Sequence, residues 1–470
     1  MEKSEEKKLE EKLFNKKHSG WETATEKEKE EIFKFSDEYI WFLNRAKTER
    51  EFVTGAVKIL EENGFKDIAN METIKTGDKV YFNNRGKSLY IAVIGSKKIE
   101  EGLNLVGAHI DSPRLDLKPN PLYEDTEFAY FNTHYYGGIK KYQWTAIPLA
   151  IHGVIVKPNG EKITVKIGED EEDPIFTITD LLPPLAKDQL QKKLNDGIDG
   201  EDLNLLIGNM PYEGEGIKDK VKLNVLRLLN EKYGITEADF LSSELELVPA
   251  FNAKSLGFDK SMVAGYGHDD KVCAYASLRA ILEAKNIEKT SICILSDKEE
   301  VGSMGNTGME SQTFDYFVSE LLNKSGENRP NLLNKVFCNS SMLSADVGVI
   351  YDPIYGSVSD RTNCAYSAYG ISFDKYTGSR GKAGGSDANA EFIAKLRGIL
   401  EKNNIQYQVA ELGKVDVGGG GTIAYILANK GVEVIDCGVP VLSMHSPYEV
   451  ASKYDIYSAY RTYKVFYEEA

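Results

Sequence analysis

Cysteine is scarce in this sequence, and long hydrophobic runs are missing. The 470 residues include five cysteines, at positions 273, 293, 338, 364 and 437, and no two of them form a Cys-x-x-Cys pair. Several lie inside apolar runs, so we expect reduced core residues and neither a disulfide framework nor a cysteine zinc site. No run of 18 apolar residues is present, which is the length that a membrane-spanning helix needs.

Positively charged residues are fewer than negatively charged ones. The chain has 57 Lys and Arg against 73 Asp and Glu, a formal net charge of -16. This balance argues against nucleic acid and anionic membranes as partners. The N-terminal stretch MEKSEEKKLEEKLFNKK is charged where a secretion signal has an apolar core. We therefore expect a soluble, cytoplasmic protein with no nucleic-acid or membrane partner.

Carboxylates are what the sequence does have, and two of them follow an apolar run. Residues 292–295, ICIL, predict a buried strand, and Glu299 and Glu300 come just after it. In α/β proteins the loops beyond the carboxyl ends of strands collect ligands and catalysts. Neighbouring residues in extended backbone point in opposite directions, so one glutamate can hold a metal ion while the other acts as a base. A solvated charged turn is the alternative for such a pair taken alone.

Four more candidates end strand-like runs elsewhere. They are His109 after NLVGA, Asp269 in GHDDK, Asp346 after LSA and His445 after VPVLSM. Each has an ordinary alternative when taken alone, such as a helix cap for Asp269 or a surface histidine for His109. Together with Glu300 they supply two imidazoles and three carboxylates. This donor set suits a pair of divalent ions of borderline softness, with one carboxylate bridging them.

The chain is long enough for two or three domains or for one large domain with an insertion. Residues 1–116 and 251–470 alternate helix and strand patterns, whereas residues 117–250 are β-rich and are interpreted as an inserted domain. His152 lies in an apolar run of this insertion, where a packed core or interface histidine is the alternative to a functional one.

Five motifs identify a family. AHIDSPRLDLKP, GHDDK, SDKEEVGS, SADVG and MHSPYE resemble, in order and over nearly the whole chain, the M18 metalloaminopeptidases, a family that includes aspartyl aminopeptidase. GHDDK stands where eukaryotic members have an Asp-Asn pair, so the chain is similar to a bacterial branch. The resemblance implies a three-layer α/β/α di-zinc peptidase fold with an inserted β-rich dimerisation domain. It also implies an aminopeptidase that acts on peptides with a free N-terminus.

The resemblance assigns roles to the candidates. One ion is held by His109 and Asp346, and the other by Glu300 and His445. Asp269 bridges them, Glu299 is the general base, and Asp111 supports the imidazole of His109. The implied cofactor is two divalent ions per chain, zinc or, as alternatives, manganese or cobalt.

One further role follows from the resemblance, and one follows from the basic residues themselves. LAIHG is similar to a segment in which a histidine of one subunit reaches the active site of its dimer partner. His152 is thus expected to stabilise an oxyanion, within a homo-oligomer that is a dodecamer built from dimers. Lys375, near Arg380 and Lys382 in a glycine-rich segment, is a candidate for binding an acidic substrate residue, with a solvated loop as the alternative.

Two other functions fit the same sequence. A di-metal carboxypeptidase or deacylase would use the same ligands. A catalytically silent binding or scaffold protein could have kept the fold, although the intact Glu299 argues against it.

Overall fold

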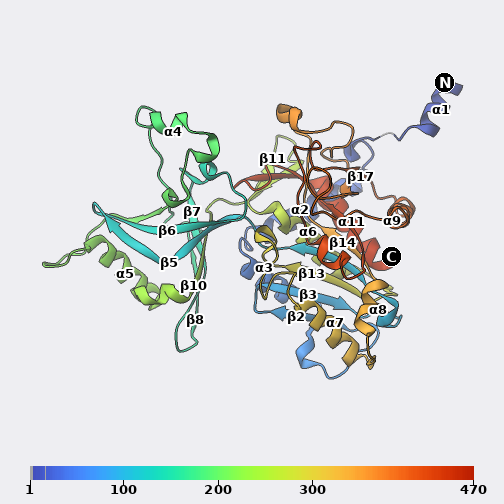
Figure 1. Ribbon diagram of the computed structural model, residues 1–470, viewed down its shortest axis with the longest axis horizontal. Helices are drawn as coiled ribbons and strands as arrows, with labels where there is room; N and C mark the ends of the chain where they lie inside the picture. Colours follow the sequence, from blue (N-terminus) through green and yellow to red (C-terminus); the bar gives the residue numbers. More distant parts are fainter. Residues whose placement is uncertain (1–3, 16) are drawn as a thin grey trace.

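The computed structural model describes residues 4–15 and 17–470, and this part of the chain contains three β-sheets. Figure 1 shows one sheet in a lobe of its own, with the other two in a larger lobe beside it. Within the described ranges, no helix combines the length and the apolar character needed to cross a membrane.

The central sheet of the larger lobe has nine strands. Their order is β1 (Lys66–Asp67), β2 (Lys79–Asn84), β3 (Ser88–Val93), β13 (Ser291–Ser296), β4 (Asn104–His109), β14 (Ser341–Ala345), β18 (Glu433–Gly438), β16 (Ile371–Asp374) and β17 (Tyr407–Ala410). The middle strands β13, β4, β14 and β18 pair in parallel. Their carboxyl ends therefore meet at one edge.

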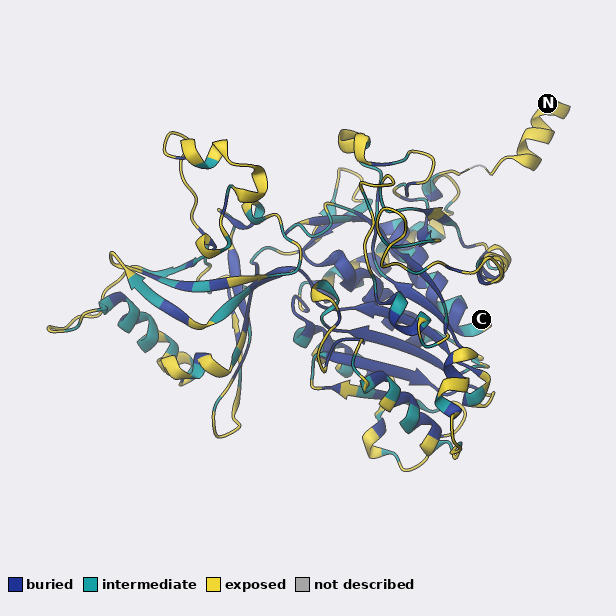
Figure 2. Cartoon of the chain, in the orientation of Figure 1, coloured by how far each residue is buried: buried dark blue, intermediate teal, exposed yellow. Residues whose placement is uncertain are grey.

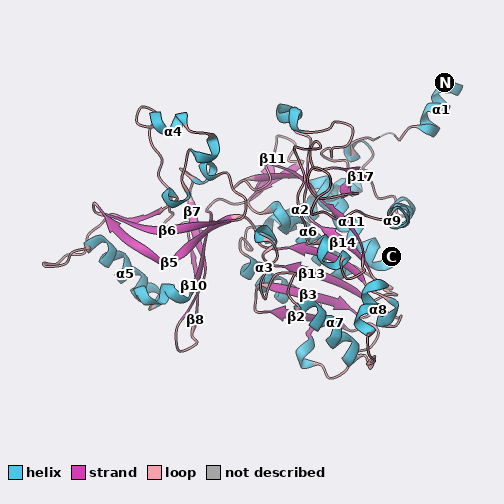
Figure 3. Cartoon of the chain, viewed as in Figure 1, coloured by secondary structure: helices cyan, strands magenta, loops and turns pink. Residues whose placement is uncertain are grey.

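Helices cover both faces of this sheet (Figure 3). Alternate residues of β13 enter different cores: Cys293 and Leu295 pack in one, Ile292 and Ile294 in the other. This is the period of two that a strand buried on both faces imposes. The first core contains residues of α2 (Glu26–Leu43), α3 (Glu49–Glu62), α6 (His268–Glu283), α9 (Ala390–Lys402) and α11 (Lys453–Glu469). The second contains residues of α7 (Thr313–Lys324), α8 (Leu332–Cys338) and α10 (Ala424–Ala428). The expected mixed α/β fold is confirmed.

The helices α2 and α3 each begin with a capping box. Thr25 and Glu28 form a capping box at the start of α2, and Thr48 and Glu51 form another at α3. Each box satisfies backbone N–H groups that have no partner inside the helix. The exposed helix α1 (Glu5–Leu13) precedes them, and none of its residues is buried.

A five-stranded sheet lies beside the central one. Its order is β11 (Lys254–Leu256), β12 (Met262–Gly265), β20 (Glu449–Ser452), β19 (Pro440–Leu442) and β15 (Gly348–Val349). The turn after β12 leads into α6, which is buried along most of its length (Figure 2). Small residues such as Ala274 and Ala276 let this helix lie close to the strands.

The smaller lobe is built on a six-stranded antiparallel sheet. Its order is β8 (Lys162–Ile167), β7 (Leu149–Val156), β10 (Ser243–Pro249), β5 (Arg114–Asp125), β6 (Phe128–Tyr136) and β9 (Leu205–Gly208). The helices α4 (Lys187–Gln191) and α5 (Lys220–Tyr233) belong to the same lobe (Figure 1). A separate apolar core around Trp144 holds it together. The division at residues 117 and 250 stays a prediction, and residues 1–3 and 16 lie outside the described ranges.

Candidate metal centre

Three parallel strands bring candidate residues to one edge of the central sheet. His109 is the last residue of β4, and its neighbours β13 and β14 end at Ser296 and Ala345. Asp346 follows β14 directly, and Glu299 opens a short 3₁₀ helix just beyond β13. The shared strand direction thus gathers residues that are far apart in sequence.

The five-stranded sheet supplies the other two candidates. Asp269 lies in the first turn of α6 with non-helical φ and ψ angles, and its peptide bond to Asp270 is cis. His445 follows β19 and adopts a positive φ of 64°. Both side chains reach the edge of the central sheet, as the following distances show.

His109, Asp269, Glu300, Asp346 and His445 converge, and we call them the central cluster. His109 Nε2 lies 3.2 Å from Asp269 Oδ1 and 3.8 Å from Asp346 Oδ1. His445 Nε2 lies 3.1 Å from Asp269 Oδ2 and 3.6 Å from Glu300 Oε2. Each of the two triads, with Asp269 in both, has its ligand atoms within 4.8 Å of one another. Asp269 therefore offers one oxygen to each side.

The central cluster fits divalent cations. Burial, together with the charge of Asp269, raises the pKa of Glu300 well above its usual range. Burial also raises the pKa of Asp346. Glu300 Oε1 is buried without a hydrogen-bond partner. Buried carboxylates of this kind are costly unless cations compensate them, and nitrogen and oxygen donors suit zinc.

Asp111 links the two strand ends. Its Oδ1 lies 3.2 Å from His109 Nδ1, which is also 3.1 Å from the Asp111 carbonyl oxygen. The backbone N–H groups of Glu299 and Glu300 both donate to its carboxylate at 3.2 Å. When Nδ1 of His109 carries the proton, Nε2 presents a lone pair to the cluster, which is the usual arrangement for a metal-binding imidazole.

Glu299 stands beside the cluster without belonging to either triad. Its Oε2 lies 3.8 Å from His109 Nε2. Burial raises its pKa to about 8, and the neighbouring aspartates act in the same direction. A carboxylate in this position is free to take up and return a proton.

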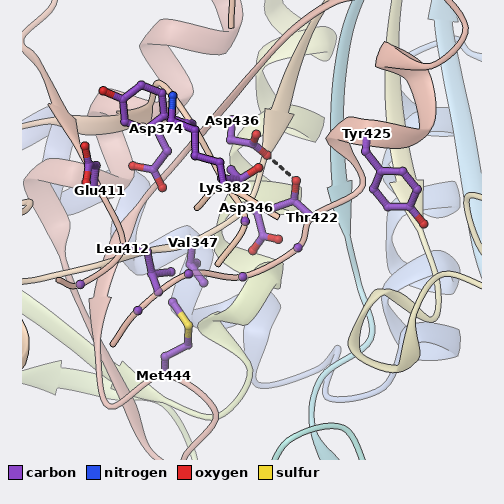
Figure 4. Close-up of a pocket in the computed structure, with 18 of the residues that line it drawn as sticks. Asp346, Val347, Asp374, Lys382, Glu411, Leu412, Thr422, Tyr425, Asp436 and Met444 are labelled. Carbon is purple, nitrogen blue, oxygen red and sulfur yellow. Dashed lines mark hydrogen bonds between the residues drawn. The ribbon is translucent and has the colours of Figure 1, made fainter. Parts of the chain in front are cut away.

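A cavity of about 820 Å³ opens on the cluster. Figure 4 shows Asp346, which follows β14, together with Asp374 of β16 and Asp436 of β18 around this space. Two glycine-bearing segments also line it, one with Gly378 and Lys382 and the other with Gly419 and Gly420. The lining includes Asp269, Glu299, Arg380, Lys382, Glu411 and Tyr425.

The basic candidates are placed differently from one another. Arg380 and Lys382 line the cavity, whereas Lys375 does not. Lys382 Nζ lies 3.2 Å from Asp387 Oδ2 and 3.6 Å from the ring centre of Tyr376. Lys375 is exposed, with its ammonium 5.7 Å from the ring centre of Tyr376.

His152 is placed away from the cavity lining. It lies in β7 with no exposed surface. Its Nδ1 is 3.0 Å from Glu51 Oε1, and its Nε2 is 3.0 Å from Glu169 Oε1. Only Nε2 is at hydrogen-bonding geometry, toward Glu169, and the role expected for His152 in a partner's active site stays a prediction.

Glu449 is a contributor that sequence reasoning missed. It accepts hydrogen bonds from the backbone N–H groups of Asp269 at 3.1 Å and His445 at 2.8 Å. The carboxylate thereby fixes the two residues from the five-stranded sheet. Glu449 is the last residue of the motif MHSPYE, which was the available signal, but the motif alone does not show that its carboxylate binds these two backbone groups.

Comparison with known families identifies one match over most of the chain. The family model described as "Aminopeptidase I zinc metalloprotease (M18)" matches residues 42–467. A curated relative from Clostridium acetobutylicum, "Probable M18 family aminopeptidase 1", is 53% identical over 458 residues, which are 97% of this chain and 98% of the relative. One with the same description from Thermotoga maritima is 47% identical over 444 residues, 94% of this chain and 97% of the relative.

Solved structures agree with these matches. The crystal structure of an M18 aminopeptidase from Thermotoga maritima has a TM-score of 0.94 at 46% identity, covering 97% of this chain and 100% of the other. Aminopeptidase I from Clostridium acetobutylicum has a TM-score of 0.91 at 51% identity, covering 97% and 99%. The yeast mApe1 dodecamer is similar in fold, with a TM-score of 0.74 at 20% identity, covering 92% and 96%.

Proposed function

Because this chain belongs to the M18 family of zinc metalloproteases and is a metalloaminopeptidase, we propose that it releases N-terminal residues from peptides with two zinc ions held by the central cluster. The observation that carries the proposal is the position of Asp269, which shares its two oxygens between two triads. His109 and Asp346 complete one triad, and Glu300 and His445 complete the other. Manganese or cobalt would suit the same donors.

The residues around the cluster have separate tasks. Bound cations would polarise the scissile carbonyl and lower the pKa of the attacking water. Glu299 accepts the proton of that water and returns it to the leaving amine. Asp111 and Glu449 keep the ligands oriented. The carboxyl groups of Asp374 and Asp436, whose pKa values burial raises to about 8 and about 7, line the cavity and offer oxygen acceptors to the ammonium group of a peptide N-terminus.

Lys382, rather than Lys375, is the residue that we propose to contact an acidic substrate residue, because Lys382 lines the cavity. Asp374, Glu411 and Asp436 line the same space, so a basic residue is the competing preference. A panel of N-terminal residues, assayed with wild type, Lys382→Met and Lys375→Met, separates the two. Selective loss of acidic substrates in Lys382→Met alone supports the assignment.

We also propose a homo-oligomer in which the β-rich insertion, residues 117–250, forms a dimer interface. Six large apolar residues between positions 175 and 194 are more than half exposed, and such patches mark interaction sites. They are Ile175, Leu181, Leu182, Leu185, Leu190 and Leu194, exposed by 61, 54, 55, 69, 71 and 68%. The dodecamer of yeast mApe1 suggests the size of a complete assembly.

The proposed reaction is tested by metal content and substrate choice together. Elemental analysis should find two zinc ions per chain, and chelation should abolish hydrolysis of an aminoacyl anilide. Hydrolysis of N-acylated substrates, or release of C-terminal residues, would instead indicate the alternative function of a di-metal carboxypeptidase or deacylase. A protein that binds no metal and hydrolyses none of these substrates would indicate the catalytically silent scaffold protein. One ion per chain in an active preparation contradicts the two-ion centre.

A further inference from the structure

The end of strand β6 runs from the smaller lobe directly into the central cluster. Tyr136, its last residue, donates its hydroxyl hydrogen to Asp111 Oδ2 at 2.8 Å. Gly137 follows, and a Cβ atom placed on it would lie 3.3 Å from Glu300 Cβ. The carbonyl oxygen of Gly138 lies 2.8 Å from His445 Nδ1, at hydrogen-bonding distance. Three consecutive residues therefore contact Glu300 and His445, which belong to one triad, and Asp111, which lies against His109 of the other.

The ring of Tyr136 is held from behind. The guanidinium carbon of Arg114 lies 4.0 Å from the ring centre. Arg114 is itself buried, with Asp116 at 2.8 Å, Glu246 at 3.2 Å and Glu49 at 3.5 Å. A buried cation paired in this way cannot leave without exposing unpaired carboxylates, so the ring keeps its orientation.

Asp111 has little freedom once Tyr136 is in place. A carboxylate has about four acceptor positions. Oδ1 of Asp111 lies against the imidazole of His109 and accepts the backbone N–H of Glu299. Oδ2 accepts the hydroxyl of Tyr136 and the backbone N–H of Glu300. No side chain except Tyr136 reaches Asp111 from the smaller lobe among the hydrogen bonds of the described residues. Without that bond, the N–H of Glu300 is the only one of these four contacts left on Oδ2, so the Asp111 carboxylate is held less firmly.

We propose that Tyr136 is a positioning residue for the metal centre: its hydroxyl fixes Asp111, and Asp111 fixes the ring of His109. This inference rests on the proposed function, because it requires His109 to bind metal. It makes the β-rich lobe part of the metal centre within one chain, independently of any contact between subunits. Partners of metal-binding imidazoles commonly contribute 10–100-fold to metal affinity.

The test measures zinc affinity in the full-length chain by competition with a coloured chelator, so that it does not depend on turnover. Tyr136→Phe keeps the ring on Arg114 and removes only the hydroxyl. We expect it to weaken zinc binding roughly 10–100-fold and to lower kcat more than it raises KM. Tyr130→Phe is the matched control, because it makes the same change on the same strand at a hydroxyl that does not contact the cluster.

A second variant separates the hydroxyl from the ring. Tyr136→Leu removes both, so full affinity in Tyr136→Phe with loss in Tyr136→Leu would reduce Tyr136 to a packing residue and overturn the proposal. His109→Ala tests the premise. If it loses zinc while Tyr136→Phe does not, only the role of Tyr136 fails. If His109→Ala also keeps both ions, the proposed centre fails with it.

Discussion

Two adjacent glutamates at one strand end take up different positions in this molecule. Glu300 lies within one ligand triad, while Glu299 lies outside both and next to His109. The short 3₁₀ helix Glu299–Val301 turns the two side chains apart, and Asp111 holds it through both backbone N–H groups. Equivalent substitutions at the two positions should therefore have different consequences.

Glu299→Gln should keep both metal ions and the fold but lower kcat by roughly 10²–10⁴-fold, the usual contribution of a positioned general base. Glu300→Gln should instead reduce zinc content, because an amide is a weaker ligand than a carboxylate. Anilide kinetics and elemental analysis on both variants decide this. The reverse pattern would exchange the two assignments.

His152 should contribute to folding stability in a pH-dependent way. Burial lowers its pKa, but the neighbouring carboxylates of Glu169 and Glu51 outweigh burial, and its pKa is raised above the ordinary value. A raised histidine pKa stabilises the folded state below the ordinary value of about 6.5, and this stability is lost as the pH rises through the folded-state pKa. His152→Gln should thus cost about 3 kcal/mol of unfolding free energy near pH 6 and less near pH 9.

Urea unfolding of the zinc-free protein at the two pH values measures this difference. His134→Gln is the control, because His134 is exposed on β6. An equal cost at both pH values would contradict a charged His152. Loss of turnover with unchanged stability would instead return His152 to the predicted role in a partner's active site.

Site residues could be predicted from the sequence where they directly follow an apolar run that predicts a strand. His109, Asp346 and Glu300 each follow an apolar run, and parallel pairing then brings them together, as expected. Tyr136 and Glu449 could not be found in this way, because their partners lie far away in sequence or act through backbone groups. A lone Tyr or Glu carries no pattern that reveals such a contact. The metal-binding and catalytic roles themselves stay predictions.

At the scale of elements, the cavity depends on two glycine-bearing segments that touch one another. Gly378 N–H donates to the carbonyl oxygen of Gly420 at 2.9 Å. Gly419 has a φ of 121°, and a Cβ atom on it would lie 2.1 Å from the carbonyl oxygen of Gly378. A Cβ atom on Gly420 would meet nothing within 4 Å. Two neighbouring glycines therefore have opposite tolerance to a methyl group.

Gly419→Ala should displace the cavity wall and lower kcat/KM by up to roughly 100-fold, since a shift of about 1 Å near reacting groups has that effect. Gly420→Ala should be close to wild type. Peptide kinetics and zinc content are the measurements. Equal behaviour of the two variants, or zinc loss in Gly419→Ala, would show that the wall does not set the substrate position.

Elements were easier to predict than their contacts. The strand at residues 292–295 follows from its apolar run, and β13 lies there. The five-stranded sheet was not foreseen, because its strands are short and come from residues 254–265, 348–349 and 440–452. Pairing between such distant segments is decided by the packing of the whole chain.

At the scale of the whole molecule, the exposed apolar residues of the smaller lobe predict self-association. The double variant Leu185→Lys and Leu190→Lys should dissociate the oligomer. Association would bury the two new charges away from water, and burying an unpaired charge costs free energy. Leu228→Lys changes another half-exposed leucine, on α5, and serves as the control. Sedimentation of the three proteins measures the outcome. An unchanged assembly in the double variant would place the interface elsewhere.

The wide separation of the proposed ligands along the chain has a consequence for synthesis in the cell. The ribosome makes His109 early and His445 late, and domains form as their residues emerge. Until residue 445 has been made, the triad of Asp269 and Glu300 lacks its imidazole. A nascent chain that has not reached residue 445 would therefore lack part of the proposed two-ion centre. The proposed hydrolytic activity would therefore wait until the segment that carries His445 has been made and folded.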